Sequence, residues 1–132
     1  MILIDYTRRY YTDIVKTAVP SKITGKFVQL GSHDEFYLVI SPAAFTKYHA
    51  DIVEMFCRER GIAGSYDQEK KRFNISDRAW HVIGGGKFER DDEIKTIKFH
   101  DESMAYGKYE TSGFAAMIAA HTEFSGYTIV ME

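Results

Sequence analysis

Two strand-like segments separated by a short turn constrain the fold more than any other feature of the sequence. KITGKFVQLG (Lys22–Gly31) and EFYLVIS (Glu35–Ser41) are rich in β-branched and aromatic residues. The cluster Gly31–Asp34 between them contains residues typical of turns. This pattern predicts two paired strands, and therefore a sheet whose apolar face other elements must cover.

Two helices are predicted to provide that cover. Ser41-Pro42 is expected to open the first helix, with Ser as the cap and Pro in the first turn, and Gly61 is expected to close it. One stripe of this helix combines aromatic, branched and histidine side chains, namely Phe45, His49, Ile52 or Val53, and Phe56. Thr111 or Ser112 is expected to cap the second helix, whose stripe consists of Phe114, Met117, Ile118 and His121.

The remaining segments are predicted to be short strands and loops. Ile2–Ile4 is expected to form a short strand, and the segment 7–15 a helical turn or an edge segment. Further strands are predicted in the segments 72–76, 79–83, 93–100 and 127–131. The triple glycine Gly84–Gly86 is expected to interrupt these strands, and SMAYG (Ser103–Gly107) to be a loop. The resulting fold class is α/β (α+β): a single domain with a mixed β-sheet flanked by two α-helices.

Composition narrows the classes of partner. The chain has 132 residues, of which 45% are hydrophobic, enough for one domain with a real core. A formal net charge of −2 argues against nucleic acid or an acidic membrane surface as the main partner. Cys57, the one cysteine, lies beside Met55 and Phe56 and is expected to be a buried thiol. With no secretory signal or membrane-length apolar run visible, a cytoplasmic location is expected.

His49, in KYHADI, is the first residue that could carry chemistry. On a helix it could be a half-buried histidine bonded to a backbone group, or a base or nucleophile held rigidly. Asp51 follows two residues later and would point elsewhere on a helix, so it is a poor orienting partner. Periodicity by itself leaves both alternatives open.

Two other motifs could bind an anion. The amides of Gly84–Gly86 could cup an anion with Lys87 adding charge, although a plain bulge or turn is the more common reason for such glycines. Ser103–Gly107 offers a hydroxyl and exposed amides, or else is a tight turn with Tyr106 packed on the core. Metal-binding spacings such as HExxH or CxxC are not present, and no metal site is expected.

Taken in order, KYHADI (Lys47–Ile52), GGGK (Gly84–Lys87) and SMAYG (Ser103–Gly107) resemble the Janus/Ocnus family, and within it the protein histidine phosphatases. The resemblance extends over about residues 36–130. The first 30 residues have no counterpart in it, and form an N-terminal extension of a single domain, 1–132. The resemblance implies an α/β domain with a mixed sheet between two helices.

The resemblance also implies a function. It is metal-independent hydrolysis of the P–N bond of phosphohistidine in proteins, with phospholysine as a related substrate, no cofactor and a monomeric enzyme. His49 would be the general base or a transient nucleophile. Phosphate, or sulfate in its place, would be bound by residues of the two anion motifs, namely Gly85, Gly86, Lys87, Ser103, Met104 and Ala105.

Several departures from the family pattern leave an alternative open. Lys87 stands where the family has an arginine, and Ser41–Ala44 lacks the arginine expected before the helix. A family lysine aligns loosely with Phe36 or Tyr37, and Lys26 or Lys47 could compensate. The segment 64–81 is longer than in the family pattern, with an open role. The alternative function is therefore a non-catalytic module that binds a phosphorylated or acidic partner.

Overall fold

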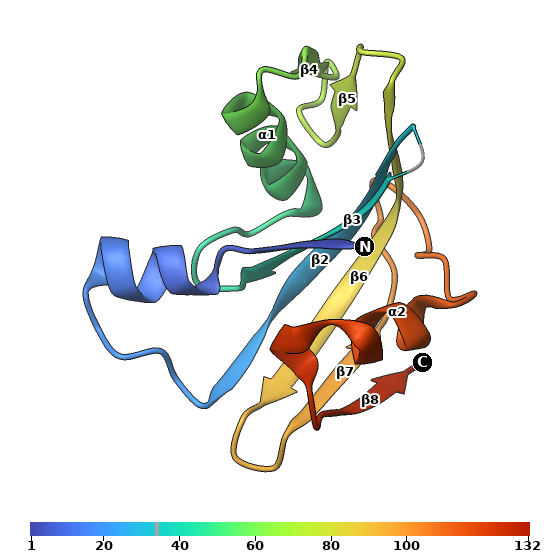
Figure 1. Cartoon of the computed structure of the whole chain (residues 1–132). Coiled ribbons are helices and arrows are strands. Elements are labelled where there is room, and N and C mark those ends of the chain that lie inside the picture. The colour runs from blue at the N-terminus through green and yellow to red at the C-terminus, as the bar shows by residue number, and fades with distance from the viewer. Residues whose placement is uncertain (34) are drawn as a thin grey trace.

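A six-stranded mixed sheet in the order β1-β3-β2-β6-β7-β8 runs through the computed structural model, which describes residues 1–33 and 35–132 (Figure 1). Its strands are β1 (Ile2–Asp5), β2 (Lys22–Ser32), β3 (Glu35–Pro42), β6 (Trp80–Asp91), β7 (Thr96–His100) and β8 (Thr128–Met131). The pairs β1–β3 and β7–β8 are parallel and the others antiparallel, which confirms the predicted mixed sheet. Asp34, the last residue of the predicted turn cluster, lies outside the described residues.

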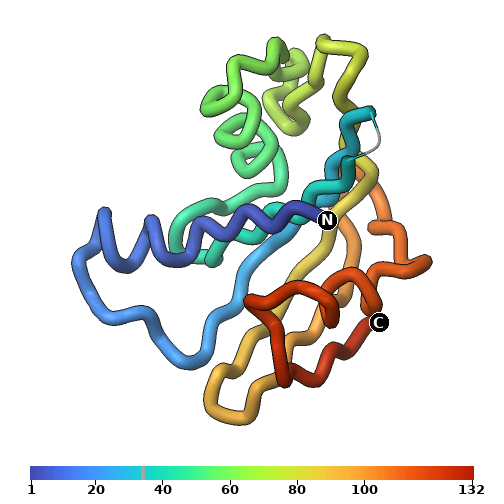
Figure 2. The backbone as a smooth tube through the Cα atoms, viewed as in Figure 1, coloured from blue at the N-terminus to red at the C-terminus, as the bar shows by residue number. Residues whose placement is uncertain are grey.

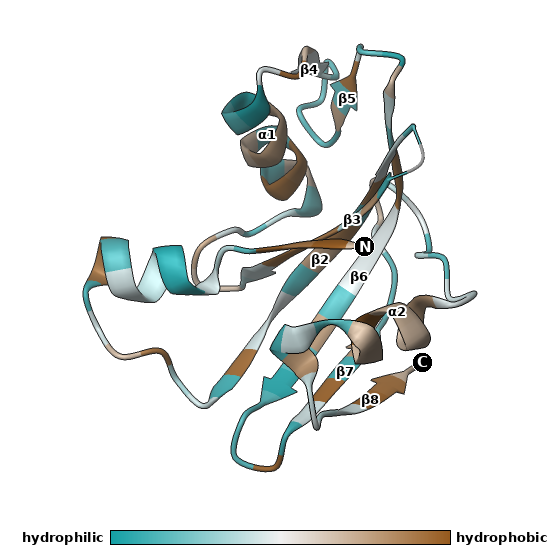
Figure 3. Ribbon diagram, in the orientation of Figure 1, coloured by the Kyte–Doolittle hydropathy of each residue, from teal (hydrophilic) through white to brown (hydrophobic). Residues whose placement is uncertain are grey.

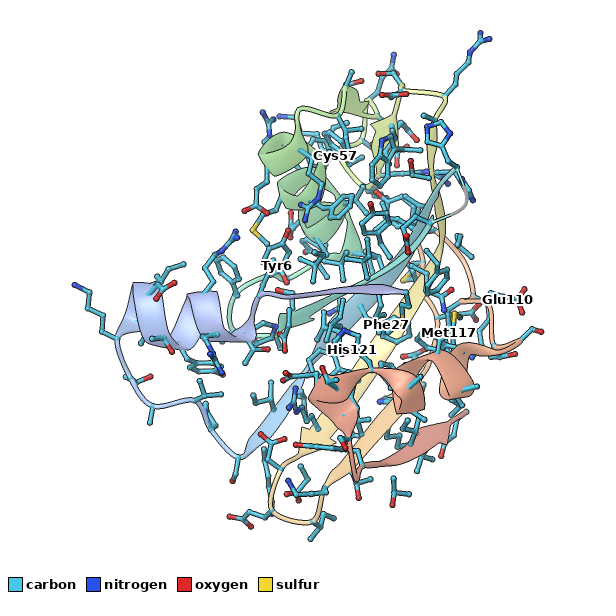
Figure 4. All side chains as sticks on the ribbon, in the orientation of Figure 1. Tyr6, Phe27, Cys57, Glu110, Met117 and His121 are labelled. Carbon is cyan, nitrogen blue, oxygen red and sulfur yellow. The ribbon has the colours of Figure 1, made fainter. Side chains whose placement is uncertain are left out.

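The central strands are apolar on both faces because a helix packs against each face. Val28, Leu30 and Val39 pack beneath α1 (His49–Arg60), while Phe27 and Leu38 point to the side of α2 (Phe114–Ala120). Consecutive buried residues such as Phe27–Leu30 are the pattern expected of a strand covered on both faces. Figure 3 shows the hydrophobic colouring most clearly on β1 and β3, and Figure 4 shows Cys57 and Phe27 in the two separate layers.

Smaller elements surround this core. β4 (Gly64–Tyr66) and β5 (Phe73–Ile75) form a separate two-stranded sheet next to α1 (Figure 2). A π-helix, η1 (Arg9–Val15), follows β1, and a 3₁₀ turn, η2 (Thr122–Phe124), follows α2. The Tyr6 hydroxyl donates a 2.6 Å hydrogen bond to Glu59 Oε1, which ties the N-terminal segment to α1.

The start of the first helix differs from the prediction. Ser41 and Pro42 end β3, where they pair with Lys26 and Gly25, so strand pairing overrides their local preference for a helix start. The helix begins eight residues after Ser41, at His49, and it ends at Gly61 as predicted, in a left-handed conformation with φ 66°.

Three other boundaries also differ. The triple glycine lies inside the continuous strand β6, so the predicted interruption is wrong. Strand β7 begins at Thr96, and Ile94, 70% exposed, belongs to the turn before it. Helix α2 is capped by Gly113 rather than by Thr111 or Ser112. The predicted burial of Cys57 is confirmed. No helix in the described residues is long and apolar enough to cross a membrane.

Candidate active site

His49 is placed by the cap of α1. Tyr48, the residue before the helix, is extended, and its N–H donates a 2.9 Å hydrogen bond to Asp51 Oδ2. A carboxylate in the first turn satisfies a free helix amide and complements the positive end of the helix dipole. Asp51 therefore holds the helix start rather than orienting the imidazole, which agrees with its position two residues beyond His49.

The imidazole of His49 is buried and carries one strong hydrogen bond. Its side chain is 7% exposed, and Nε2 lies 2.8 Å from the carbonyl oxygen of Gly86. Because a carbonyl can only accept, Nε2 carries the hydrogen of this bond. Burial lowers the pKa of His49 below its usual value, and the nearby Lys26 and Lys87 lower it further against the opposing effect of the Gly86 carbonyl and Asp101. The neutral ring at pH 7 therefore has its lone pair on Nδ1, where it can accept a proton.

Gly85 provides the space for this ring. A Cβ atom at Gly85 would lie 2.6 Å from the Phe27 carbonyl oxygen and 2.9 Å from His49 Cδ2. The strand can therefore carry the imidazole against its surface only where the side chain is a hydrogen. The glycines that suggested an anion cup thus serve here to seat the histidine, through the Gly86 carbonyl and the bare face of Gly85.

The same glycine anchors the 103–107 loop. The Gly85 carbonyl accepts a 3.1 Å hydrogen bond from the Ser103 N–H, and the Gly85 N–H donates at 3.2 Å to the Gly107 carbonyl. A further bond of 2.8 Å runs from the Gly107 N–H to the Ser103 carbonyl and closes the loop. His49 and Ser103, the nearest predicted site residues of the helix and the loop, are 54 positions apart in the sequence. The fold brings them together around Gly85.

Within the loop, two amides remain free. The Ser103 N–H is used in the bonds that close the loop, and its Oγ accepts a 3.1 Å bond from the Tyr106 N–H. The N–H groups of Met104 and Ala105 donate to no acceptor in residues 1–33 and 35–132. The Met104 side chain is fully exposed and packs against no part of the core. These two amides are the part of the predicted cradle that can still bind an anion.

The cationic half of the site consists of two facing lysines. Lys26 on β2 is the direct register partner of Lys87 on β6. Like charges opposite each other on a sheet are unfavourable unless something neutralises them. Lys87, 49% exposed, has Asp101 Oδ2 at 3.1 Å from its Nζ, whereas no ion pair of the described residues involves Lys26. This arrangement leaves one cation uncompensated beside the histidine, as an anion site requires.

Lys26 is one of the two lysines that the sequence offered in place of the family lysine. The resemblance suggested Phe36 or Tyr37 as the equivalent of the family lysine, but these residues lie on β3, and the second lysine of the site is Lys26. Its period-two spacing from the buried Val28 was a usable signal, because residues two apart lie on one face of a strand. Lys47 instead lies over the Tyr48 ring, 5.3 Å from its centroid.

A pocket of about 270 Å³ adjoins the two lysines. Its lining consists of Thr24, Gly25, Lys26, Ala43, Lys87, Phe88, Glu89 and His100. Its lining includes neither His49 nor any residue of the 103–107 loop, so the pocket lies beside the cations and not over the imidazole. No group of three or more His, Cys, Asp or Glu side chains in the described part of the chain is arranged to hold a metal ion.

Comparison with known sequences identifies the family. The model of the Janus/Ocnus family (Ocnus) matches residues 14–128. That range includes the histidine, the triple glycine and the 103–107 loop, and it begins at residue 14, inside the segment expected to have no counterpart in the family. No curated protein matches the sequence. Since the family match extends over most of the 132 residues, the chain belongs to the Janus/Ocnus family.

Proposed function

We propose that this protein is a metal-independent phosphoamidase that hydrolyses the P–N bond of phosphohistidine, and of related phosphoramidates such as phospholysine, in proteins. The observation that carries the proposal is the buried, neutral His49, whose Nε2–H is engaged by the Gly86 carbonyl. That bond leaves Nδ1 as a base of fixed orientation. Two facing lysines and two free loop amides supply the complementary anion-binding groups around it.

In the proposed reaction, water attacks phosphorus while the P–N bond breaks. The electron pair of that bond goes to the departing imidazole nitrogen, and His49 takes the proton of the attacking water at Nδ1. His49 then returns the proton to the departing nitrogen or to solvent. The transition state of phosphoryl transfer is loose and carries its charge on the three equatorial oxygens. The Met104 and Ala105 amides and the charges of Lys26 and Lys87 would stabilise these oxygens.

Asp101 supports a second candidate, a non-catalytic module that binds a phosphorylated or acidic partner. Its carboxylate lies 3.1 Å from the Lys87 Nζ; a hydrogen bond from the Glu102 amide lowers the pKa of Asp101, and the hydrogen bond with Lys87 lowers it further. A bound phosphoryl group must therefore compete with Asp101 for Lys87. Weak recognition without turnover would result if that competition prevented the phosphoryl group from reaching His49.

Release of phosphate from phosphohistidine distinguishes the two candidates. We expect the wild type to be active with or without a chelator, and His49→Gln to lose at least about 100-fold, the lower end for removing a general base. The Gln amide can still donate to the Gly86 carbonyl, so the loss would reflect the missing base. His33→Ala, an exposed histidine, is the matched control. An inactive wild type that binds a phosphohistidine peptide would favour the module, and a fully active His49→Gln would refute the role of His49.

A further inference from the structure

The segment between α1 and β6 contacts the candidate phosphate loop directly. Its β4–β5 sheet is fixed to α1, because the Tyr66 hydroxyl donates a 2.8 Å hydrogen bond to Glu54 Oε1 and the Phe73 side chain is buried in the core beneath α1. Arg72, immediately before β5, extends from this fixed base to the loop. Its Nη1 donates a 3.0 Å hydrogen bond to the Ala105 carbonyl oxygen.

Tyr106 provides a second connection between the two segments. Its hydroxyl accepts a 3.0 Å bond from the Phe73 N–H and donates a 2.8 Å bond to the Phe73 carbonyl. Burial raises the pKa of Tyr106 to about 12, so the phenol keeps the proton that it donates throughout the physiological range. The Arg72 guanidinium lies over the same ring, 5.0 Å from its centroid. Loop and segment are thus joined by hydrogen bonds and a cation–π contact.

These contacts hold one peptide group on both sides. The peptide between Ala105 and Tyr106 has its carbonyl bound by Arg72 and its N–H bound by Ser103 Oγ. With this peptide held, rotation of the adjacent Met104–Ala105 turn is restricted. The two amides without an acceptor in the described residues lie in this turn. An anion site formed by backbone amides depends on such restriction, because free rotation lowers the fraction of time that both amides face one ligand.

The charge of Arg72 is also available for this role. No ion pair among the residues that the structure describes involves Arg72, whereas its neighbour Lys71 pairs with Glu69, 3.2 Å from Nζ to Oε2. A pocket of about 190 Å³ adjoins this contact and lies between β5 and the start of β6; it is lined by Arg72, Phe73, Asn74, Ile75, Trp80, His81, Val82 and Tyr106. In the described residues, the hydrogen bonds between the segment and the loop are those of Arg72 with Ala105 and of Phe73 with Tyr106.

We propose that Arg72 is a positioning residue that, together with Tyr106, locks the Met104–Ala105 turn in the conformation that binds the phosphoryl group. The proposal rests on the proposed function for the identity of the ligand. Arg72 touches the loop and not the reacting atoms, so it acts on the cradle and leaves the proton chemistry of His49 unchanged.

The test compares Arg72→Met with Arg78→Met, an exposed arginine of the same segment with no contact to the loop in the described residues. Inorganic phosphate is titrated while the backbone ¹⁵N relaxation of Met104 and Ala105 is recorded. We expect Arg72→Met to weaken phosphate binding about tenfold, as when the competent loop population falls to roughly a tenth. The relaxation should report increased motion at these two residues and not at Gly85. Arg72→Lys, which keeps one donor and the charge, should recover part of the affinity.

Enzyme kinetics provide an independent readout. kcat/KM for phosphohistidine should fall about tenfold in Arg72→Met with an unchanged pH profile, because the base is unaltered. Tyr106→Phe, which removes the bonds to Phe73, should weaken phosphate binding in the same direction. Wild-type phosphate affinity and unaltered loop motion in both variants would overturn the proposal, as would a wild type that binds no phosphate. A wild type that binds phosphate through this loop without hydrolysing phosphohistidine would refute the proposed activity and leave the role of Arg72 standing.

Discussion

Replacing Gly85 by alanine tests the idea that the triple glycine seats the histidine. The added Cβ would lie 2.6 Å from the Phe27 carbonyl oxygen and 2.9 Å from His49 Cδ2. The first neighbour is the backbone of a central strand and cannot move cheaply. The contact with the Phe27 carbonyl can be relieved only by a costly shift of the strand, and we expect the imidazole to be displaced as well, away from its hydrogen bond with the Gly86 carbonyl.

The expected cost follows from two effects. Adding a methyl group to a packed interior costs about 1–3 kcal/mol. Losing the bond between His49 Nε2 and the Gly86 carbonyl adds about 0.5–1.5 kcal/mol. Gly85→Ala should therefore reduce the free energy of unfolding by about 3 kcal/mol. It should also change the environment of the imidazole, so that hydrolytic activity falls by more than the loss of folded protein explains.

Urea denaturation measures the stability, and the NMR signals of the His49 ring report its position and pKa. Gly61→Ala is the matched control, because Gly61 has a φ of 66° and a Cβ there would meet nothing within 4 Å. It should cost about 1–2 kcal/mol through backbone strain and leave the His49 signals unchanged. If Gly85→Ala had wild-type stability and unshifted His49 signals, the steric argument for the triple glycine would be wrong.

Three further outcomes are expected. Lys26→Met should raise the dissociation constant for phosphate about tenfold, or ~1.4 kcal/mol, in calorimetric titration, and equal affinity would remove Lys26 from the site. Burial lowers the pKa of His49 from its usual value of 6.5, so the unfolded chain binds more protons than the folded chain as the pH falls. The contribution of neutral His49 to the free energy of unfolding is therefore full above pH 6.5. Below that pH it decreases by at most about 1.4 kcal/mol per pH unit. Urea denaturation of His49→Gln should show a smaller fall, and identical curves would contradict the shift. Gln29→Leu should lower the free energy of unfolding by about 2 kcal/mol or more in the same assay. The buried Gln29 amide accepts a 2.8 Å hydrogen bond from the Glu110 N–H and donates one of 2.9 Å to the Glu110 carbonyl. Unchanged stability would show that these bonds contribute little.

Local patterns predicted the element types well where one face of an element or both faces are buried. β2 and β3 emerged from their branched and aromatic residues, and α1 ends at Gly61 because only a residue that tolerates positive φ fits there. Boundaries failed where pairing with a distant segment competes with local preference. Ser41 and Pro42 resemble a helix start, yet they extend β3 because β2 offers them partners.

The triple glycine shows more clearly that local preference does not predict where a strand ends. Glycine is a weak strand former, so a local reading favours a break. In the folded chain these residues pair with β2 in the middle of a continuous strand. The missing side chains admit the His49 ring at Gly85 and the backbone of Lys108 at Gly84. The groups that fill this space come from other parts of the chain. The local sequence around the glycines therefore could not have predicted that the strand continues through them.

The sequence by itself determined the element types, the family and the identity of His49 and the SMAYG loop as the candidate site, because periodicity and motifs are local properties of the chain. Tertiary structure decided which loop amides stay free, that Lys26 faces Lys87, and that Arg72 binds the loop. The physical reason is that these features arise from strand register and from contacts between residues far apart in the chain. A register shift of one residue would turn Lys26 to the opposite face of the sheet.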